Sequence, residues 1–198
     1  MQDTIAKYFP EFTTIQIEKL YALTAIYGEW NQKINVISRK DISHFGIHHI
    51  LHSLALIKVI HPTPSILDIG TGGGFPGIPL AIAMPDVHFV LIDSIHKKIR
   101  VVNDVVARLQ LSNVETHCTR MEVHKGKYGA IVSRAVAPTP QLMEWTKHNT
   151  FKDTTYYLLK GGDLLSELHG VRRHEVIAIS DYFDEGYFET KKIVKIKV

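Results

Sequence analysis

Three glycines, Gly70, Gly72 and Gly74, directly follow the apolar segment 65–69 and form a G-x-G-x-G pattern. Glycine adopts positive φ at little cost and lets a ligand approach the backbone closely, and the helix expected next presents unpaired N–H groups at its start. We therefore expect this loop to hold a nucleotide-type cofactor. Asp93 ends the next apolar segment, 23 residues after Gly70, where doubly wound folds place a carboxylate that binds ribose hydroxyls.

Asp68 stands two residues before the first glycine, and we expect it at the strand end, facing the ligand. Its charge would repel the pyrophosphate of a dinucleotide but attract the ammonium and sulfonium groups of S-adenosylmethionine. The sequence thus predicts a methyltransferase with S-adenosylmethionine as its cofactor. Because the glycine pattern is shared between cofactor classes, a nicotinamide-dependent oxidoreductase is kept as an alternative.

Further polar residues follow the later strands at the same edge of the expected sheet. Arg134 directly follows the segment 130–133. An arginine at this edge of the sheet suits a phosphate-bearing substrate and a target nitrogen that needs no deprotonation. The alternative is a surface salt bridge. Met121 and Glu122 follow the third strand and would border the adenine, whereas Lys160 offers a cation over the same cleft or merely caps its strand.

Three histidines recur at four-residue spacing, His44, His48 and His52, and could share one helix face as metal ligands do. No cysteine or glutamate completes a ligand set, so we expect no metal. The interpretation that we favour is a face turned toward solvent or a polyanion, formed by these three residues together with Arg39, Lys40 and His49.

The composition is that of one ordinary globular domain. The 198 residues are 45% hydrophobic and 22% charged, and this length suits a single catalytic core. No apolar run reaches the ~20 residues of a membrane helix, and the first residues lack a basic region followed by an apolar segment, so we expect a cytoplasmic protein. A single cysteine, Cys118, excludes an internal disulfide. The net charge of +3 is compatible with an anionic partner without requiring one.

The order of the expected elements predicts an α/β, Rossmann-like fold with a mostly parallel seven-stranded sheet. Residues 1–62 read as a helical extension packed on the core, with helices over 14–30 and from 41 or 43 to 60, ended by a proline-rich break. Residues 63–198 form the core, where strands and helices alternate and an antiparallel hairpin finishes the sheet. The expected strands are 66–69, 89–92, 114–118, 130–133, 156–159, 176–179 and 191–198, and the expected helices are 78–84, 97–109, 141–148 and 164–168.

These motifs together resemble the glucose-inhibited division protein B family, the 16S ribosomal RNA guanine-N7 methyltransferases. The most specific part is the continuation of the glycine loop, Gly-Phe-Pro-Gly-Ile-Pro-Leu over residues 74–80. The other matching segments are 30–35, 49–53, 67–73, 93–98, 120–122, 133–135 and 159–161. The resemblance covers most of the chain and implies a class I S-adenosylmethionine-dependent methyltransferase.

The resemblance also implies a reaction, a partner and a set of site residues. The expected activity is methylation of N7 of a specific guanine in 16S rRNA, in the small ribosomal subunit or an assembly intermediate, by a monomer. Lys160 and the N-terminal helices match parts that face RNA, although many members carry aspartate where this chain has His52 and a basic residue nearer His48. The expected catalytic residues are Arg134 and Lys160, and the expected cofactor-binding residues are Asp68, Gly70, Gly72, Gly74, Phe75, Asp93, Met121, Glu122 and Arg134.

Guanine N7 carries a lone pair and no proton, so its methylation needs no general base, and alignment of donor and acceptor would supply the catalysis. Two other readings share the same cofactor loop. One is a small-molecule methyltransferase in which the N-terminal helices act as a lid, and the other is a noncatalytic RNA-binding module.

Overall fold

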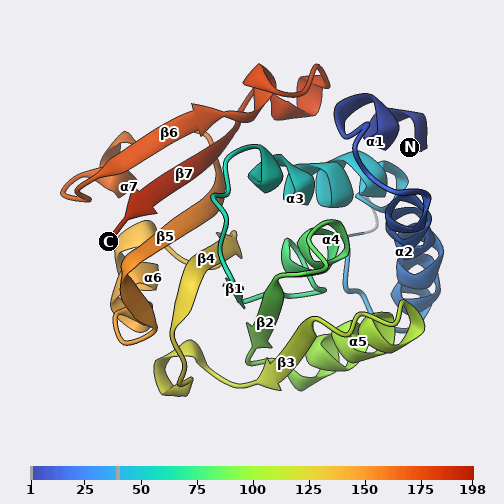
Figure 1. The fold of residues 1–198 in the computed structure, drawn as a ribbon, viewed down its shortest axis with the longest axis horizontal. Helices are drawn as coiled ribbons and strands as arrows, with labels where there is room; N and C mark the ends of the chain where they lie inside the picture. Colours follow the sequence, from blue (N-terminus) through green and yellow to red (C-terminus); the bar gives the residue numbers. More distant parts are fainter. Residues whose placement is uncertain (1, 39–40) are drawn as a thin grey trace.

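A seven-stranded sheet runs through the centre of the molecule (Figure 1). The computed structural model of the protein describes residues 2–38 and 41–198. The strand order is β3-β2-β1-β4-β5-β7-β6, and among the described strands β7 alone runs opposite in direction to the other six. The predicted α/β fold and all seven predicted strands are confirmed. The strands are β1 (Ser65–Ile69), β2 (His88–Asp93), β3 (Val114–Cys118), β4 (Tyr128–Arg134), β5 (Thr150–Gly161), β6 (His174–Ala178) and β7 (Lys191–Lys197).

The register of the parallel strands decides where the functional residues emerge. Ile69, at the end of β1, is paired with Ile92 of β2 on one side and with Ser133 of β4 on the other. The residues that follow these three positions therefore leave the sheet together at one edge. In open α/β sheets, ligands bind at this carboxyl edge, where the connections diverge to opposite faces.

Helices cover both faces of the sheet, as Figure 1 shows. Side chains alternate across each strand, so that Ile66 packs into a core with the N-terminal helices whereas Leu67 packs into a second core with α6. The helices on the first face are α1 (Gln2–Tyr8), α2 (Thr14–Lys33), α3 (His52–Leu54), α4 (Gly77–Ala83) and α5 (His96–Arg108), and those on the second are α6 (Thr139–Thr146) and α7 (Leu165–Leu168).

The N-terminal segment is helical as predicted, but its second helix is irregular. The Thr13 hydroxyl and the Gln16 side chain form a capping box that begins α2 where the sequence indicated. The predicted continuous helix up to residue 60 is instead a 3-10 turn, a π-helix over Gly46–Leu51, the short α3 and a final 3-10 turn over Ala55–Lys58.

This segment shares the first core with the sheet and with α4 and α5. The division of the chain at residues 62 and 63 stays a prediction. No helix within the described ranges has both the length and the hydrophobicity that crossing a membrane requires.

Two glycines in helices give opposite expectations for substitution by alanine. A Cβ at Gly77, the first residue of α4, would lie 2.7 Å from the Asp68 Oδ2 atom and 2.7 Å from the Leu91 Cγ atom. We expect Gly77→Ala to lower the free energy of unfolding by about 1–3 kcal/mol, the usual cost of overpacking. A Cβ at Gly28, within α2, would meet no described atom within 4 Å, so Gly28→Ala should raise stability by about 0.5–1 kcal/mol.

Urea denaturation of the two variants beside the wild type measures both effects. Equal stability changes in the two variants would contradict the tight approach of α4 to β1 and β2.

Candidate functional site

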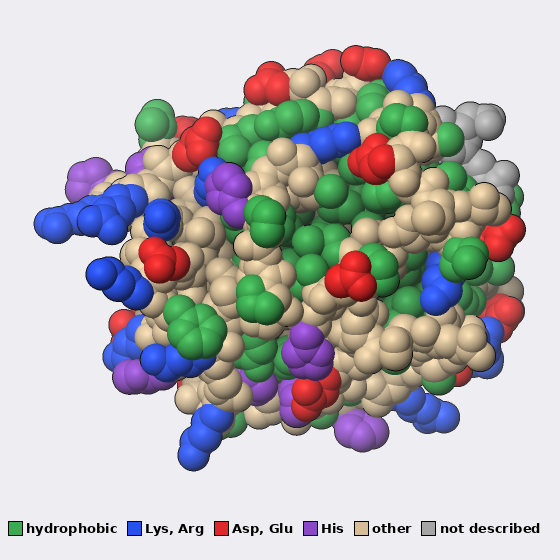
Figure 2. Space-filling model, viewed as in Figure 1, with side chains coloured by type: hydrophobic (Ala, Val, Ile, Leu, Met, Phe, Trp, Pro, Cys, Tyr) green, Lys and Arg blue, Asp and Glu red, His purple; other side chains and the backbone are tan. Residues whose placement is uncertain are grey.

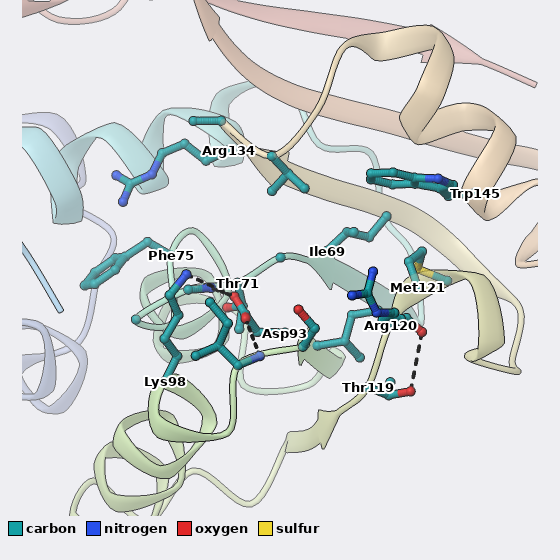
Figure 3. Close-up of a pocket in the computed structure, with 18 of the residues that line it drawn as sticks. Ile69, Thr71, Phe75, Asp93, Lys98, Thr119, Arg120, Met121, Arg134 and Trp145 are labelled. Carbon is teal, nitrogen blue, oxygen red and sulfur yellow. Dashed lines mark hydrogen bonds and ion pairs between the residues drawn. The ribbon is translucent and has the colours of Figure 1, made fainter.

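A cavity of about 500 Å³ opens at the carboxyl edge of the sheet, where β1, β2 and β4 end. Its walls come from the loops after β1, β2, β3 and β4 (Figure 3). Arg134 and Phe75 lie at one end of the cavity, Met121 and Trp145 lie at the other, and Asp93 lies between them. The structure therefore brings together residues that are far apart in the sequence, in the arrangement predicted for a nucleotide-type cofactor.

The glycine loop after β1 forms one wall of the cavity. Gly70 and Gly72 both line the cavity with positive φ, +61° and +59°, which explains why glycine is favoured at these two positions. The Thr71 amide donates to the Ile92 carbonyl over 2.9 Å and so ties the loop to β2. Gly74, predicted to bind the cofactor, is not among the lining residues, and it packs instead against Tyr27 of α2 and Ile78 of α4.

Asp93 holds the middle of the cavity and is itself held by backbone N–H groups. Its Oδ2 atom accepts a hydrogen bond from the Gly72 amide over 3.0 Å, and its Oδ1 atom accepts one from the Ile95 amide over 2.9 Å. The Lys98 ammonium lies 3.6 Å from Oδ2. The carboxylate thus couples the two loops, and each oxygen keeps acceptor capacity for a ligand hydroxyl.

The far end of the cavity is partly apolar. Met121 is buried there and Glu122 is exposed, and both line the cavity as predicted. Sequence reasoning did not assign Arg120, Lys98 or Trp145 to the site, although Arg120 and Lys98 lie in the matching segments 120–122 and 93–98. Trp145 lies on α6, on the opposite side of the sheet from the glycine loop's helix, and nothing in its local sequence indicated that it would reach this cavity.

Arg134 lies at the opposite end and joins β4 to the irregular N-terminal helix. One of its nitrogens donates to the His48 carbonyl over 3.1 Å, and the other lies 3.0 Å from His49 Nδ1. The guanidinium carbon is 5.4 Å from the centroid of the Phe75 ring. Burial lowers the pKa of the guanidinium, which still carries its charge at neutral pH. The π-helix supplies the carbonyl that fixes this side chain.

Lys160 does not line the cofactor cavity. Its ammonium forms an ion pair with Glu167 at 2.6 Å and donates to the Ala137 carbonyl over 2.9 Å. It faces a neighbouring cavity of about 340 Å³, which we call the second cavity. Arg134 and Ala135 line both cavities, so the two predicted catalytic residues meet at the second cavity rather than at the first.

Asp68 lies elsewhere than the sequence indicated, and the structure corrects the expectation that it faces the ligand. Its side chain is fully buried and is not among the lining residues. Its Oδ2 atom accepts from the Thr71 hydroxyl over 2.6 Å and from the Gly77 amide over 2.8 Å. The Thr71 hydroxyl and the first amide of α4 hold the Asp68 side chain inside the protein, where it supports the glycine loop and does not line the cavity.

Burial raises the pKa of Asp68 to about 7. The folded protein keeps this proton up to about pH 7, whereas the unfolded chain loses it near its ordinary pKa of about 3.9, so the free energy of unfolding falls as the pH rises between these values. An asparagine does not titrate, so Asp68→Asn removes this pH-dependent fall in the free energy of unfolding. We expect the melting temperature of the variant relative to the wild type to increase from about pH 5 to about pH 8.

Thermal scans at several pH values measure this difference. Asp86→Asn, at an exposed position, removes the same charge and serves as the control. Parallel curves for wild type and Asp68→Asn would contradict the burial of an ionisable carboxyl.

The histidines divide into two groups. His44 is exposed, and His48 Nδ1 lies 2.9 Å from Asp41 Oδ1. His49 and His52 point into the protein, and burial lowers the pKa of each to about 3. The expectation that His49 and His52 face solvent is therefore wrong. The predicted contributions of Arg39 and Lys40 lie outside the described residues, and within these residues no three metal-ligating side chains gather as a metal site requires.

The sequence matches a family model and many curated proteins over nearly its whole length. The matching model, GidB, is described as rRNA small subunit methyltransferase G and covers residues 16–186. The Ribosomal RNA small subunit methyltransferase G of Christiangramia forsetii is 48% identical over 97% of this chain and 95% of its own. The protein of the same name from Flavobacterium johnsoniae is also 48% identical, over 98% of this chain and 97% of its own.

Solved structures share the fold at low sequence identity. A SAM-dependent methyltransferase from Aquifex aeolicus superimposes with a TM-score of 0.62 at 14% identity, over 78% of this chain and 93% of its own. M. jannaschii TYW2 in complex with AdoMet superimposes with a TM-score of 0.58 at 13% identity, over 75% and 74%. These likenesses establish the Rossmann-like architecture.

Proposed function

Because this chain belongs to the rRNA small subunit methyltransferase G family, we propose that it methylates N7 of one guanine in 16S rRNA. The chain is an rRNA methyltransferase, and its cofactor is S-adenosylmethionine. What we propose beyond this is the methylated atom, N7, the base, guanine, and the RNA, 16S rRNA. The observation that carries it is the placement of Asp93 and Arg134 in one cavity, with a second cavity adjoining at Arg134.

The residues that line the first cavity fit the cofactor. Gly70 and Gly72 leave the backbone open to close approach, and the carboxylate of Asp93 can accept hydrogen bonds from ribose hydroxyls. Met121 and Trp145 offer apolar surface for the adenine. The cofactor supplies an activated methyl group when bound. With adenine at the Met121 end, Phe75 and Arg134 would hold the methionine portion.

The ionisable groups around this cavity support a reaction without a general base. Among the described lining residues, Asp93 is engaged by two N–H groups and Lys98, and Glu122 is exposed at the far end. Arg134 stays protonated and cannot accept a proton. Guanine N7 needs no deprotonation, so these residues have only to bind, orient and exclude water.

The distribution of charge supports a polyanionic substrate. Lysine, arginine and histidine side chains gather at the left of the face seen in Figure 2, over the part of the chain where Figure 1 places α7, β6 and the C-terminus. Exposed basic residues of α7, β6 and the segment between them are His169, Arg172, Arg173 and His174, and the exposed acidic residues beside them are Asp163 and Glu175. We propose the small ribosomal subunit, or an intermediate of its assembly, as the substrate. A monomeric state and a cytoplasmic location stay predictions.

Transfer of a labelled methyl group tests the proposal. The protein is incubated with radiolabelled S-adenosylmethionine and, separately, with unmethylated small subunits, free 16S rRNA, large ribosomal subunits and a metabolite extract. We expect label in 16S rRNA. Label only in metabolites would instead establish a small-molecule methyltransferase, and label only in large-subunit RNA would contradict the 16S assignment.

A further inference from the structure

The second cavity adjoins the first at the Arg134 end, where Phe75 and Arg134 would hold the methionine portion of the cofactor. Arg134 and Ala135 form the shared wall. Ala135 has a positive φ of 54°, which is uncommon for a residue other than glycine and marks a place where the surroundings impose the backbone. A methyl acceptor must reach the reactive end of the cofactor, and the second cavity leads to that end.

Stacked rings form one side of the second cavity. The ring centroids of His48 and Tyr187 lie 3.9 Å apart with planes 17° from parallel. His44 continues the stack on His48, at 4.9 Å and 14°. The Lys191 ammonium lies 4.8 Å from the centroid of the Tyr187 ring. The stack covers the facing surfaces of these rings, and His48 and Tyr187 still line the cavity, where a base can pack beside them and a cation can meet a phosphate.

The charges around the second cavity also suit a nucleotide. Arg134, Lys160 and Lys191 are cationic, and the carboxylates that face them are Asp41, which pairs with His48, and Glu167, which pairs with Lys160. His49 and His52 are neutral at pH 7 because burial and the charge of Arg134 lower the pKa of each to about 3. Their Nε2 atoms are buried and have no hydrogen-bond partner among the described residues.

We propose that the second cavity receives the target nucleotide, with the base packed against the part of the Tyr187 and His48 stack that lines the cavity and a phosphate beside Lys191. This inference rests on the proposed function and adds the residues that hold the acceptor. Tyr187 and Lys191 are then substrate-binding residues, and their side chains act on RNA rather than on S-adenosylmethionine. Lys191 and Ile193 lie on the same face of β7, toward the N-terminal helices, whereas Lys192 lies on the other face, where its ammonium donates to the Gly162 carbonyl over 2.8 Å.

Steady-state methylation of unmethylated small subunits by four variants tests the proposal, together with calorimetric binding of S-adenosylmethionine. We expect Tyr187→Ala to lower kcat/KM for RNA by about 10-fold to 100-fold through loss of the ring that packs against the base and supports His48. Tyr187→Phe, which keeps the ring, should restore most of it. Lys191→Ala should raise KM for RNA and make it less sensitive to salt, and Lys192→Ala should behave as the wild type. All four should bind S-adenosylmethionine with a Kd within about twofold of the wild-type value.

Each other outcome is decisive. Normal RNA kinetics in both Tyr187→Ala and Lys191→Ala, with an active wild type, would overturn the inference and leave the proposed function intact. If the variants weaken S-adenosylmethionine binding as much as RNA turnover, the substituted residues belong to the cofactor site, and this result also overturns the inference. A wild type that binds S-adenosylmethionine but methylates no RNA would remove the proposed function and the inference together. If Tyr187→Ala does not fold, Lys191→Ala still decides, because it keeps the Tyr187 ring and removes the cation assigned to the phosphate.

Discussion

Arg134→Ala is expected to lower kcat/KM for RNA methylation by about 100-fold or more. The guanidinium separates the two cavities and connects β4 to the π-helix through His48 and His49. Without it, the second cavity loses a cation, and the His48 carbonyl and the half-buried His49 lose their hydrogen-bond partner. Misplacement of reacting groups by about 1 Å is enough for a loss of this size.

Arg134→Lys separates charge from geometry. A lysine keeps the positive charge but cannot reach the carbonyl and the imidazole with two nitrogens held in one plane, so most of the loss should remain. Arg108→Ala, which breaks surface ion pairs with Glu29 and Asp104 on α2 and α5, is the control and should keep full activity. Recovery of wild-type turnover in Arg134→Lys would show that only the charge matters, and the positional argument would then be wrong.

Asp93→Ala is expected to raise the Kd for S-adenosylmethionine by about 100-fold or more. A hydrogen bond to a charged group contributes about 1.5–3 kcal/mol, and about 1.4 kcal/mol corresponds to a tenfold change in Kd. The substitution removes the acceptor for the ribose hydroxyls and also the anchors of Gly72 and Ile95. Isothermal titration calorimetry measures the affinity directly.

Asp93→Asn keeps one oxygen acceptor and should lie between the alanine variant and the wild type. Asp86→Ala, in the exposed turn before β2, removes the same charge outside the cavity and should leave the Kd unchanged. An Asp93→Ala protein that binds S-adenosylmethionine normally would contradict the placement of the ribose in the middle of the cavity.

The sequence was sufficient to predict the sheet because each strand carries its own signal. Apolar residues on both faces of β1, β2 and β4 are typical of parallel strands covered on both sides. The carboxyl edge then follows from the topology, and it places Gly70, Asp93 and Arg134 together. The irregular segment over Gly46–Leu51 could not be predicted, since an apolar repeat does not distinguish a π-helix from an α-helix.

The site was predicted less completely because side-chain direction is decided by tertiary contacts. Asp68 was expected to select the cofactor by its charge, yet the Thr71 hydroxyl and the Gly77 amide turn its carboxylate into the core. The prediction of S-adenosylmethionine is confirmed, but by the family and not by that argument. Trp145 reaches the cavity from α6, whose local sequence carries no sign of it.

The atom that accepts the methyl group is the most direct test of the account. After reaction of unmethylated small subunits with S-adenosylmethionine, the 16S rRNA is treated with borohydride and aniline, which cleave the chain at N7-methylguanosine, and the ends are mapped by primer extension. The account predicts one new cleavage site that requires the protein and disappears with Arg134→Ala. Stoichiometric label in 16S rRNA without such a cleavage would place the methyl group on another atom and contradict it.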